Sequence, residues 1–149
     1  MAIKRSIGRK ISNERAAQVA QQTTAGLDEP DPARERIILL VEDEVLIRMT
    51  VADVLREHGY CVIEAASGDE ALRLLNSGIN CDLVVSDVQM PGGIDGTALV
   101  QRLKIDRPHL PVILASGHLA AAHDSEAVAF IAKPYGPSDV VAIAARILD

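Results

Sequence analysis

One stretch of sequence decides the fold of this chain: LVVSDVQMPGG at residues 83–93. Its first half is an apolar run that ends at Asp87, and a proline and two glycines then impose a turn. Such a run is typical of a strand buried in a parallel sheet. Ligands of open parallel α/β sheets bind outside the carboxyl ends of the strands, which is where Asp87 would lie. Taken alone, however, an Asp after a strand is more often a turn or cap residue.

Three other strand-like runs also end in polar side chains. The run at 37–41 is followed by Glu42 and Asp43, the run at 112–115 by Ser116, and the run at 130–132 by Lys133. Each residue has an ordinary interpretation by itself: a helix start, a loop serine or a solvated lysine. If the strands are parallel, however, their carboxyl ends share one edge of the sheet, and all of these groups meet Asp87 there.

This set of side chains has a chemical logic. Carboxylate oxygens bind hard cations such as Mg²⁺, which also hold phosphate oxygens. A lysine and a hydroxyl would bind the remaining oxygens of a phosphoryl group. Because phosphoryl transfer depends mainly on positioning and on charge stabilisation, the residues predict a site for that reaction.

The whole pattern alternates strands and helices five times from Ile37 onward. Strands are predicted near 37–41, 60–64, 82–86, 111–115 and 128–132. Signals for the starts and ends of helices lie between them and after the last strand: a capping box at 67–70, an N-cap at Asp95, a helix stop at Gly59 and a first-turn proline at Pro137. On the last helix, Val140, Ile143, Ala144 and Ile147 share a face that we expect to be core.

With these motifs in order, the chain resembles the receiver domain of two-component response regulators over residues 36–149. The matching segments are ILLVEDE at 38–44, VSDVQMP at 85–91, Asp95-Gly96, PVILASGH at 111–118 and Lys133-Pro134. The resemblance implies an α/β fold of the flavodoxin-like kind: a doubly wound, five-stranded parallel sheet of order 2-1-3-4-5 with helices on both faces. In that order the first and third strands are neighbours, so Glu42 and Asp43 would lie beside Asp87.

The resemblance also implies a role for each site residue. Asp87 would be the phosphoacceptor. Asp43, Asp87 and the backbone carbonyl of Gln89 would bind Mg²⁺, and Glu42 would act on it through water. Ser116 would be the switch hydroxyl, Lys133 the phosphate-pairing lysine and Phe130 the aromatic switch residue. Gln89 and His118 occupy positions that border the path of the water that hydrolyses the acyl phosphate.

The chain departs from the family pattern at four places. Glu42 stands where many members have Asp, and Tyr135 stands where Phe is usual. The pair Gly92-Gly93 adds one residue to the usual turn, and residues 119–129 are short for the family by about one turn of the fourth helix.

Charge is divided unevenly along the chain. Residues 1–35 are predicted to form a basic, then polar tail and linker, and residues 36–149 the folded domain. That domain carries nine basic and sixteen acidic side chains, a net charge of −7, so direct nucleic-acid binding is not expected. Within the tail, Ile3, Ile7 and Ile11 recur every four residues, which fits either an amphipathic docking segment or, more simply, a solvated tail.

Composition excludes several other classes of protein. No apolar run reaches the roughly 20 residues that span a bilayer, and there is no signal-peptide pattern, so a cytoplasmic protein is expected. Cys61 and Cys81 are far apart and flanked by apolar residues, which favours buried, reduced thiols over a disulfide or a zinc site.

The sequence therefore predicts a signalling protein, not an enzyme. A histidine kinase or histidine phosphotransfer protein would donate the phosphoryl group, and the signal would pass to an unknown downstream protein, with a homodimer possible. No output domain is expected after Asp149. Two alternatives stay open: a Mg²⁺-dependent aspartyl-phosphate phosphatase, although Gln89 stands where a second acid is typical, and a receiver-shaped binding module that is not phosphorylated.

Overall fold

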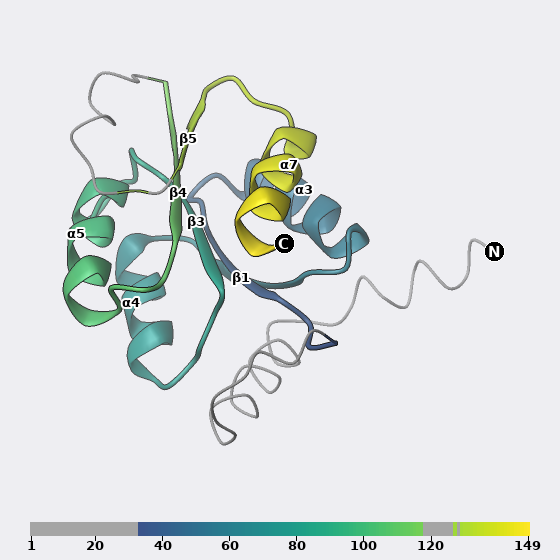
Figure 1. Ribbon diagram of the computed structural model, residues 1–149. Coiled ribbons are helices and arrows are strands. Elements are labelled where there is room, and N and C mark those ends of the chain that lie inside the picture. The colour runs from purple at the N-terminus through teal and green to yellow at the C-terminus, as the bar shows by residue number, and fades with distance from the viewer. Residues whose placement is uncertain (1–32, 118–126, 128) are drawn as a thin grey trace.

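A computed structural model describes residues 33–117, 127 and 129–149 of the chain (Figure 1). Within these residues five strands form one parallel sheet of order β2-β1-β3-β4-β5. The strands are β1 (Ile37–Val41), β2 (Cys61–Ala65), β3 (Leu83–Asp87), β4 (Val112–Ser116) and β5 (Ala129–Ala132). The predicted fold class and strand order are confirmed.

Strand boundaries differ from the prediction by one residue at most of the strands. The first strand begins and ends as predicted, whereas β2, β3 and β4 each start and end one residue later. At β3 the backbone N–H of Asp82 still donates to the carbonyl of Ile37 (2.7 Å), but the N–H of Ile37 donates to the Asp82 side chain (2.8 Å) and not to a backbone carbonyl, so the ladder is incomplete there. At β4 the displaced residue is Pro111, which has no N–H to donate to a neighbouring strand.

Four helices lie within the described residues. They are α3 (Val45–Glu57), α4 (Gly68–Asn76), α5 (Gly96–Asp106) and α7 (Pro137–Leu148). The hydroxyl of Ser67 accepts from the backbone N–H of Glu70 (3.1 Å), and the carboxylate of Asp95 accepts from Ala98 (2.8 Å), so both predicted N-caps are confirmed. Gly59 follows α3 with a φ of +92°, and Pro137 opens α7.

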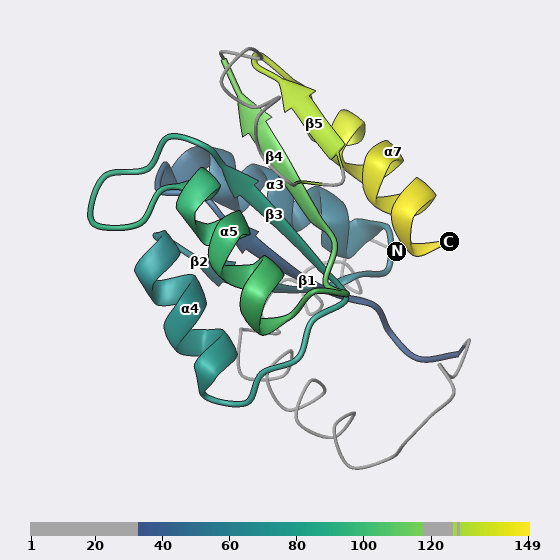
Figure 2. The ribbon, with the colours of Figure 1, turned by 60° about the vertical axis from the view of Figure 1, so that its left-hand side comes forward.

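The helices cover both faces of the sheet and create two apolar clusters. Helices α4 and α5 lie on one face, and α3 and α7 on the other (Figures 1 and 2). Alternate residues of β1 divide between the clusters: Leu39 packs under α4 and α5, whereas Ile38 and Leu40 pack under α3 and α7. On α7, Val140 and Ala144 are buried as predicted, but Ile143 and Ile147 are only partly buried against the same cluster.

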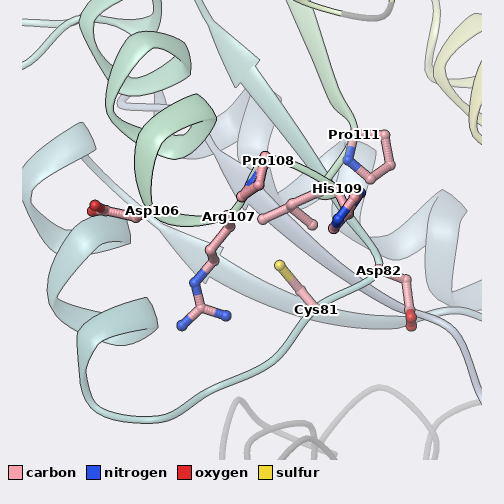
Figure 3. A pocket seen from close by; sticks show the side chains of 8 residues that line it. Cys81, Asp82, Asp106, Arg107, Pro108, His109 and Pro111 are labelled. Carbon is pink, nitrogen blue, oxygen red and sulfur yellow. The ribbon is translucent and has the colours of Figure 1, made fainter. Parts of the chain in front are cut away.

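The amino ends of the strands form the opposite edge from Asp87. There Arg34 makes a bidentate ion pair with Asp82, and the thiol of Cys61 donates to the carboxylate of Glu35 (2.8 Å). A cavity of about 450 Å³ opens beside this edge, between the segments that precede β3 and β4 (Figure 3). Its lining includes Cys81, Arg107 and His109, none of which belongs to the predicted site.

Both cysteines are free, as predicted, and each residue as a whole is partly exposed, although the thiol of Cys81 is shielded enough for burial to raise its pKa to about 12. Partial exposure follows from their places: Cys61 opens an edge strand, and Cys81 lies in the segment before β3. His118, the region of the fourth helix and the isoleucines of the tail fall outside the described residues. The division at residues 35 and 36 stays a prediction.

Candidate functional site

Three carboxylates meet at the carboxyl edge of the sheet. Glu42 and Asp43 follow β1, and Asp87 ends β3, which lies directly beside β1 in register Val41 to Ser86. One oxygen from each carboxylate lies within 4.8 Å of the others. Glu42 and Asp87 are almost fully buried, at 3 % and 6 % exposure. The sheet topology therefore concentrates negative charge in a place with little solvent.

The Asp87 carboxylate is held through both of its oxygens. Its Oδ1 accepts from the backbone N–H of Gln89 (3.2 Å), and its Oδ2 lies 2.6 Å from Nζ of Lys133. The lysine comes from the residue that follows β5, two strands away in the sheet. Hydrogen bonds to a charged partner are stronger than neutral ones, so Asp87 is both oriented and partly neutralised.

Glu42 has a different environment. Its Oε1 accepts from the backbone N–H of Glu44 (3.1 Å). Burial nevertheless raises the pKa of Glu42 to about 7, and the negative charge of Asp87 raises it further. The hydrogen bond from Glu44 and the positive charge of Lys133 lower the pKa, but they offset the effect of burial only in part. Ionisation of Glu42 therefore costs free energy, and a nearby cation would lower that cost.

Two groups from the segment after β5 face the acids. Burial lowers the pKa of Lys133, but the hydrogen bond and charge of Asp87, with the charges of Glu42 and Asp43, outweigh it and leave that pKa raised. Burial, with the charges of Glu42 and Asp87, raises the pKa of Tyr135 to about 12. Lys133 therefore stays a cation and Tyr135 a neutral phenol at physiological pH.

Ser116 ends β4, between the acids and the lysine. It is 4 % exposed, and its backbone carbonyl accepts from the N–H of Lys133 (2.9 Å). In the register of β4 with β5, Ser116 lies opposite Ala132, and Leu114 lies opposite Phe130. The hydroxyl and the aromatic ring are thus carried by two paired strands, and the lysine by the residue that follows the second of them.

The turn after Asp87 is fixed by a close backbone approach. The N–H of Gly96 donates to the carbonyl of Val88 (2.9 Å). A Cβ at position 96 would lie 2.8 Å from Cα of Val88 and would also overlap the carbonyl oxygen of Asp87. Only glycine fits there, so the start of α5 sets the position of the segment that carries Asp87 and Gln89.

The structure brings together most of the residues that the sequence singled out. Glu42, Asp43, Asp87 and Lys133 form one cluster, and the backbone of Gln89 joins it, although the Gln89 side chain is exposed. Sequence reasoning missed Arg48, whose guanidinium donates to the carbonyl of Glu42 (2.8 Å). Its only sequence signal is its place one helical turn after the acidic pair.

The donor set fits a hard cation. All three side chains offer carboxylate oxygens, which Mg²⁺ prefers, and the buried acids lack enough positive charge from Lys133 alone to balance them. In residues 33–117, 127 and 129–149 no other group of three or more acidic, histidine or cysteine side chains has this arrangement.

Comparison with known proteins identifies the family of the chain. The family model of the response regulator receiver domain matches residues 38–145. The transcriptional regulatory protein PdtaR of Mycobacterium tuberculosis is 35 % identical over 126 residues, which cover 79 % of this chain and 59 % of PdtaR. The chain thus spans less than two thirds of that relative's length.

Solved structures share the fold. The receiver domain of NtrX from Brucella abortus is 36 % identical with a TM-score of 0.68, covering 74 % of this chain and 97 % of that one. TrrA from Thermotoga maritima, solved with Mg²⁺ and BeF, is 29 % identical with a TM-score of 0.68, covering 75 % of this chain and 98 % of that one.

No helix among the described residues is long and apolar enough to cross a membrane.

Proposed function

Because this chain belongs to the response regulator receiver domain family, we propose that Asp87 accepts a phosphoryl group from a phosphohistidine of a histidine kinase or histidine phosphotransfer protein. One observation supports this most directly: a nearly buried carboxylate lies among two further acids and is paired with Lys133 at 2.6 Å. Such a carboxylate is held in place for attack and is surrounded by groups that can share the charge of a phosphoryl group.

The transfer is an exchange of one bond for another. An oxygen of Asp87 forms a bond to phosphorus while the bond from phosphorus to the donor imidazole breaks, and the leaving imidazole takes up a proton from solvent. Lys133 moves its hydrogen bond from Asp87 to a phosphoryl oxygen, and the hydroxyl of Ser116 binds another. Asp43, Asp87 and the carbonyl of Gln89 would hold Mg²⁺, with Glu42 acting through water, and the ion would neutralise charge on the phosphoryl group.

The switch follows from the same strands. Ser116 ends β4 and Lys133 directly follows its neighbour β5, so binding to the phosphoryl group pulls the ends of both strands toward Asp87. Phe130, partly buried on β5, then changes its packing and alters the surface offered to a downstream protein.

The phosphodonor needs access to the same edge of the sheet. The first turns of α3 begin two residues after Asp43 and expose three apolar side chains: Val45 at 53 %, Leu46 at 74 % and Met49 at 53 %. We expect this face to contact the protein that presents the phosphohistidine, because burial of exposed apolar area favours association.

The two alternatives receive less support. A phosphatase of this type needs a general acid two residues after the nucleophile, and the amide of Gln89 cannot donate a proton in that way. A binding module without phosphorylation has no use for a buried acidic cluster, whose mutual repulsion costs stability.

The test is labelling with a small phosphodonor. The protein is incubated with acetyl phosphate and Mg²⁺, and its intact mass is followed together with that of Asp87→Asn. We expect a gain of one phosphoryl group in the wild type that is stable in acid and labile in base, and none in the variant. Asp139→Asn is the matched control, because that carboxylate only caps α7. Equal labelling of Asp87→Asn and wild type would show that the acceptor is another residue.

A further inference from the structure

The backbone of Glu42, the first residue of the acidic pair, is held on both sides. The backbone N–H of Glu42 donates to the carbonyl of Ala65 at the end of β2 (3.0 Å). The backbone carbonyl of Glu42 accepts from Nη1 of Arg48 (2.8 Å). This carbonyl belongs to the peptide that joins Glu42 to Asp43, so the guanidinium of Arg48 fixes the plane from which the Asp43 side chain departs.

Arg48 is itself held by a second layer of charge. Its Nε lies 3.6 Å from Oε1 of Glu64 on β2. The other oxygen of Glu64 accepts from Nη2 of Arg56 (2.9 Å), which lies about two helical turns after Arg48 on α3. The Arg48 side chain is 17 % exposed and that of Glu64 22 %, so this arrangement is largely shielded from solvent. Glu64 therefore limits the positions open to the guanidinium of Arg48.

We propose that Arg48 is a positioning residue for the metal site: it orients the peptide between Glu42 and Asp43 so that the Asp43 carboxylate faces Asp87. The inference rests on the proposed function, because it assigns Arg48 a role at the same Mg²⁺ site. The hydrogen bond and the ion pair of the Arg48 side chain go to the Glu42 carbonyl and to Glu64, not to Asp87. Its effect passes through the backbone, and Glu64 keeps it in place.

An effect of the charge of Arg48 and an effect of its positioning role would change Mg²⁺ affinity in opposite directions. A guanidinium beside a cation site repels the cation, so its removal would strengthen Mg²⁺ binding if charge were its only influence. If Arg48 orients the acidic pair, its removal weakens binding despite the lost repulsion. If replacement of the cationic Arg48 by a neutral residue weakens Mg²⁺ binding, Arg48 therefore acts by positioning and not by charge.

Arg56 offers a matched control. It pairs with the same Glu64 and likewise donates to a backbone carbonyl, that of Val62 (3.1 Å). Its side chain is 21 % exposed, close to the 17 % of Arg48. Val62 lies inside β2, away from the acidic pair, so Arg56→Met removes comparable structural bonds without releasing the Glu42 carbonyl.

The experiment measures Mg²⁺ binding by titration calorimetry and the free energy of unfolding in urea without Mg²⁺, for wild type, Arg48→Met, Arg48→Lys and Arg56→Met. We expect Arg48→Met to bind Mg²⁺ at least about fivefold more weakly. Arg48→Lys should fall between it and wild type, because one ammonium cannot reproduce the planar fork of a guanidinium. Arg56→Met should bind within about twofold of wild type, even if its unfolding free energy drops as much.

Three results would overturn the inference. The first is Mg²⁺ binding by Arg48→Met that is as tight as in wild type or tighter, and the second is a loss of affinity in Arg56→Met as large as in Arg48→Met. If Arg48→Met does not fold, Arg48→Lys decides, and binding equal to wild type is then the contrary result. A wild-type protein that binds no Mg²⁺ would instead refute the proposed function, and the role of Arg48 with it.

Discussion

Nζ of Lys133 lies 2.6 Å from Oδ2 of Asp87, although 46 residues separate the two in the chain. The pair joins the carboxyl ends of β3 and β5 across β4. Without a phosphoryl group, the ammonium occupies an oxygen of the carboxylate that we propose to be the acceptor. Lys133 and a divalent cation are therefore expected to compete for the negative charge of Asp87.

Removal of Lys133 tests this competition. Lys133→Met should bind Mg²⁺ as tightly as wild type or up to about tenfold more tightly, because a competing cation is lost. Its free energy of unfolding without Mg²⁺ should fall by about 1–3 kcal/mol, since the nearly buried Asp87 loses a charged partner. Titration calorimetry and urea unfolding measure the two effects. A Mg²⁺ affinity reduced by more than threefold would mean that Lys133 shapes the metal site.

The two acids after β1 should contribute unequally to metal binding. Asp43→Ala should weaken Mg²⁺ binding by at least about tenfold, or 1.4 kcal/mol, and by more than Glu42→Gln does. The reason is that Asp43 is proposed to bind the ion directly, whereas Glu42 already accepts from Glu44 and acts through water. Calorimetry gives both affinities.

The same site predicts stabilisation by its ligand. Millimolar Mg²⁺ should raise the Tm of the wild type, because the ion binds the folded state and relieves repulsion among the acids. Glu44→Gln is the control and should show the same rise of Tm, since Glu44 is exposed and its side chain is outside the cluster. Absence of a thermal shift in wild type would count against a metal site.

The lifetime of the acyl phosphate should depend on the side chains of Gln89 and His118. The exposed Gln89 side chain can crowd the path of the attacking water, and a neutral His118 can orient that water. Decay of the phosphorylated protein is followed over time for wild type, Gln89→Ala and His118→Ala. We expect at least one substitution to change the rate threefold or more, about 0.65 kcal/mol in the barrier. If both decay at nearly the wild-type rate, these residues do not set the lifetime.

Position 96 should tolerate no side chain. Gly96→Ala places a methyl group against the backbone of Asp87 and Val88, so we expect a loss of about 1–3 kcal/mol in unfolding free energy and slower phosphorylation. Gly117→Ala is the matched control, because a Cβ there meets nothing within 4 Å. Urea unfolding should leave the control within about 0.5 kcal/mol of wild type. Equal stability of the two variants would contradict the close approach.

The thiol of Cys81 should react slowly at neutral pH. Burial raises its pKa from 9.0 to about 12, so at pH 7.5 the thiolate fraction is roughly a thousandfold below that of an ordinary cysteine. The raised pKa means that the rate keeps rising about tenfold per pH unit up to strongly alkaline pH. Alkylation by iodoacetamide is measured in Cys61→Ser, where Cys81 is the only thiol. Labelling in urea gives the unfolded reference, and an equal rate in the folded protein would disprove the burial effect.

Much of the fold could be predicted because its signals are local. Apolar runs mark the strands, and the caps at Ser67 and Asp95 mark helix starts, so element order follows from sequence alone. The polar residues that end the strands also point to one edge once the strands are parallel. Asp87, Asp43 and Lys133 were found in this way, by the positions they occupy relative to strands.

Contacts between distant elements were beyond this reasoning. Arg48 and Arg56 look like ordinary surface residues of an amphipathic helix, and Glu64 looks like a polar residue on an edge strand. Their association depends on how α3 lies across β2, which no local pattern specifies. The same holds for Arg34 and Asp82, which are 48 residues apart. The strand shifts at Asp82 and Pro111 show that side-chain bonding and a missing N–H decide boundaries that hydrophobicity leaves open.

The ion pair of Arg34 with Asp82 has a practical consequence for protein engineering. It fixes the entering chain at the amino edge of the sheet, and α7 returns the chain to the same edge, where the charge of Asp149 acts on Tyr60, the residue before β2. A fluorescent protein or surface tether fused at either end of the domain would therefore attach on the side away from Asp87. Immobilised on a sensor chip through either fusion, the domain would still present its acidic edge to soluble proteins.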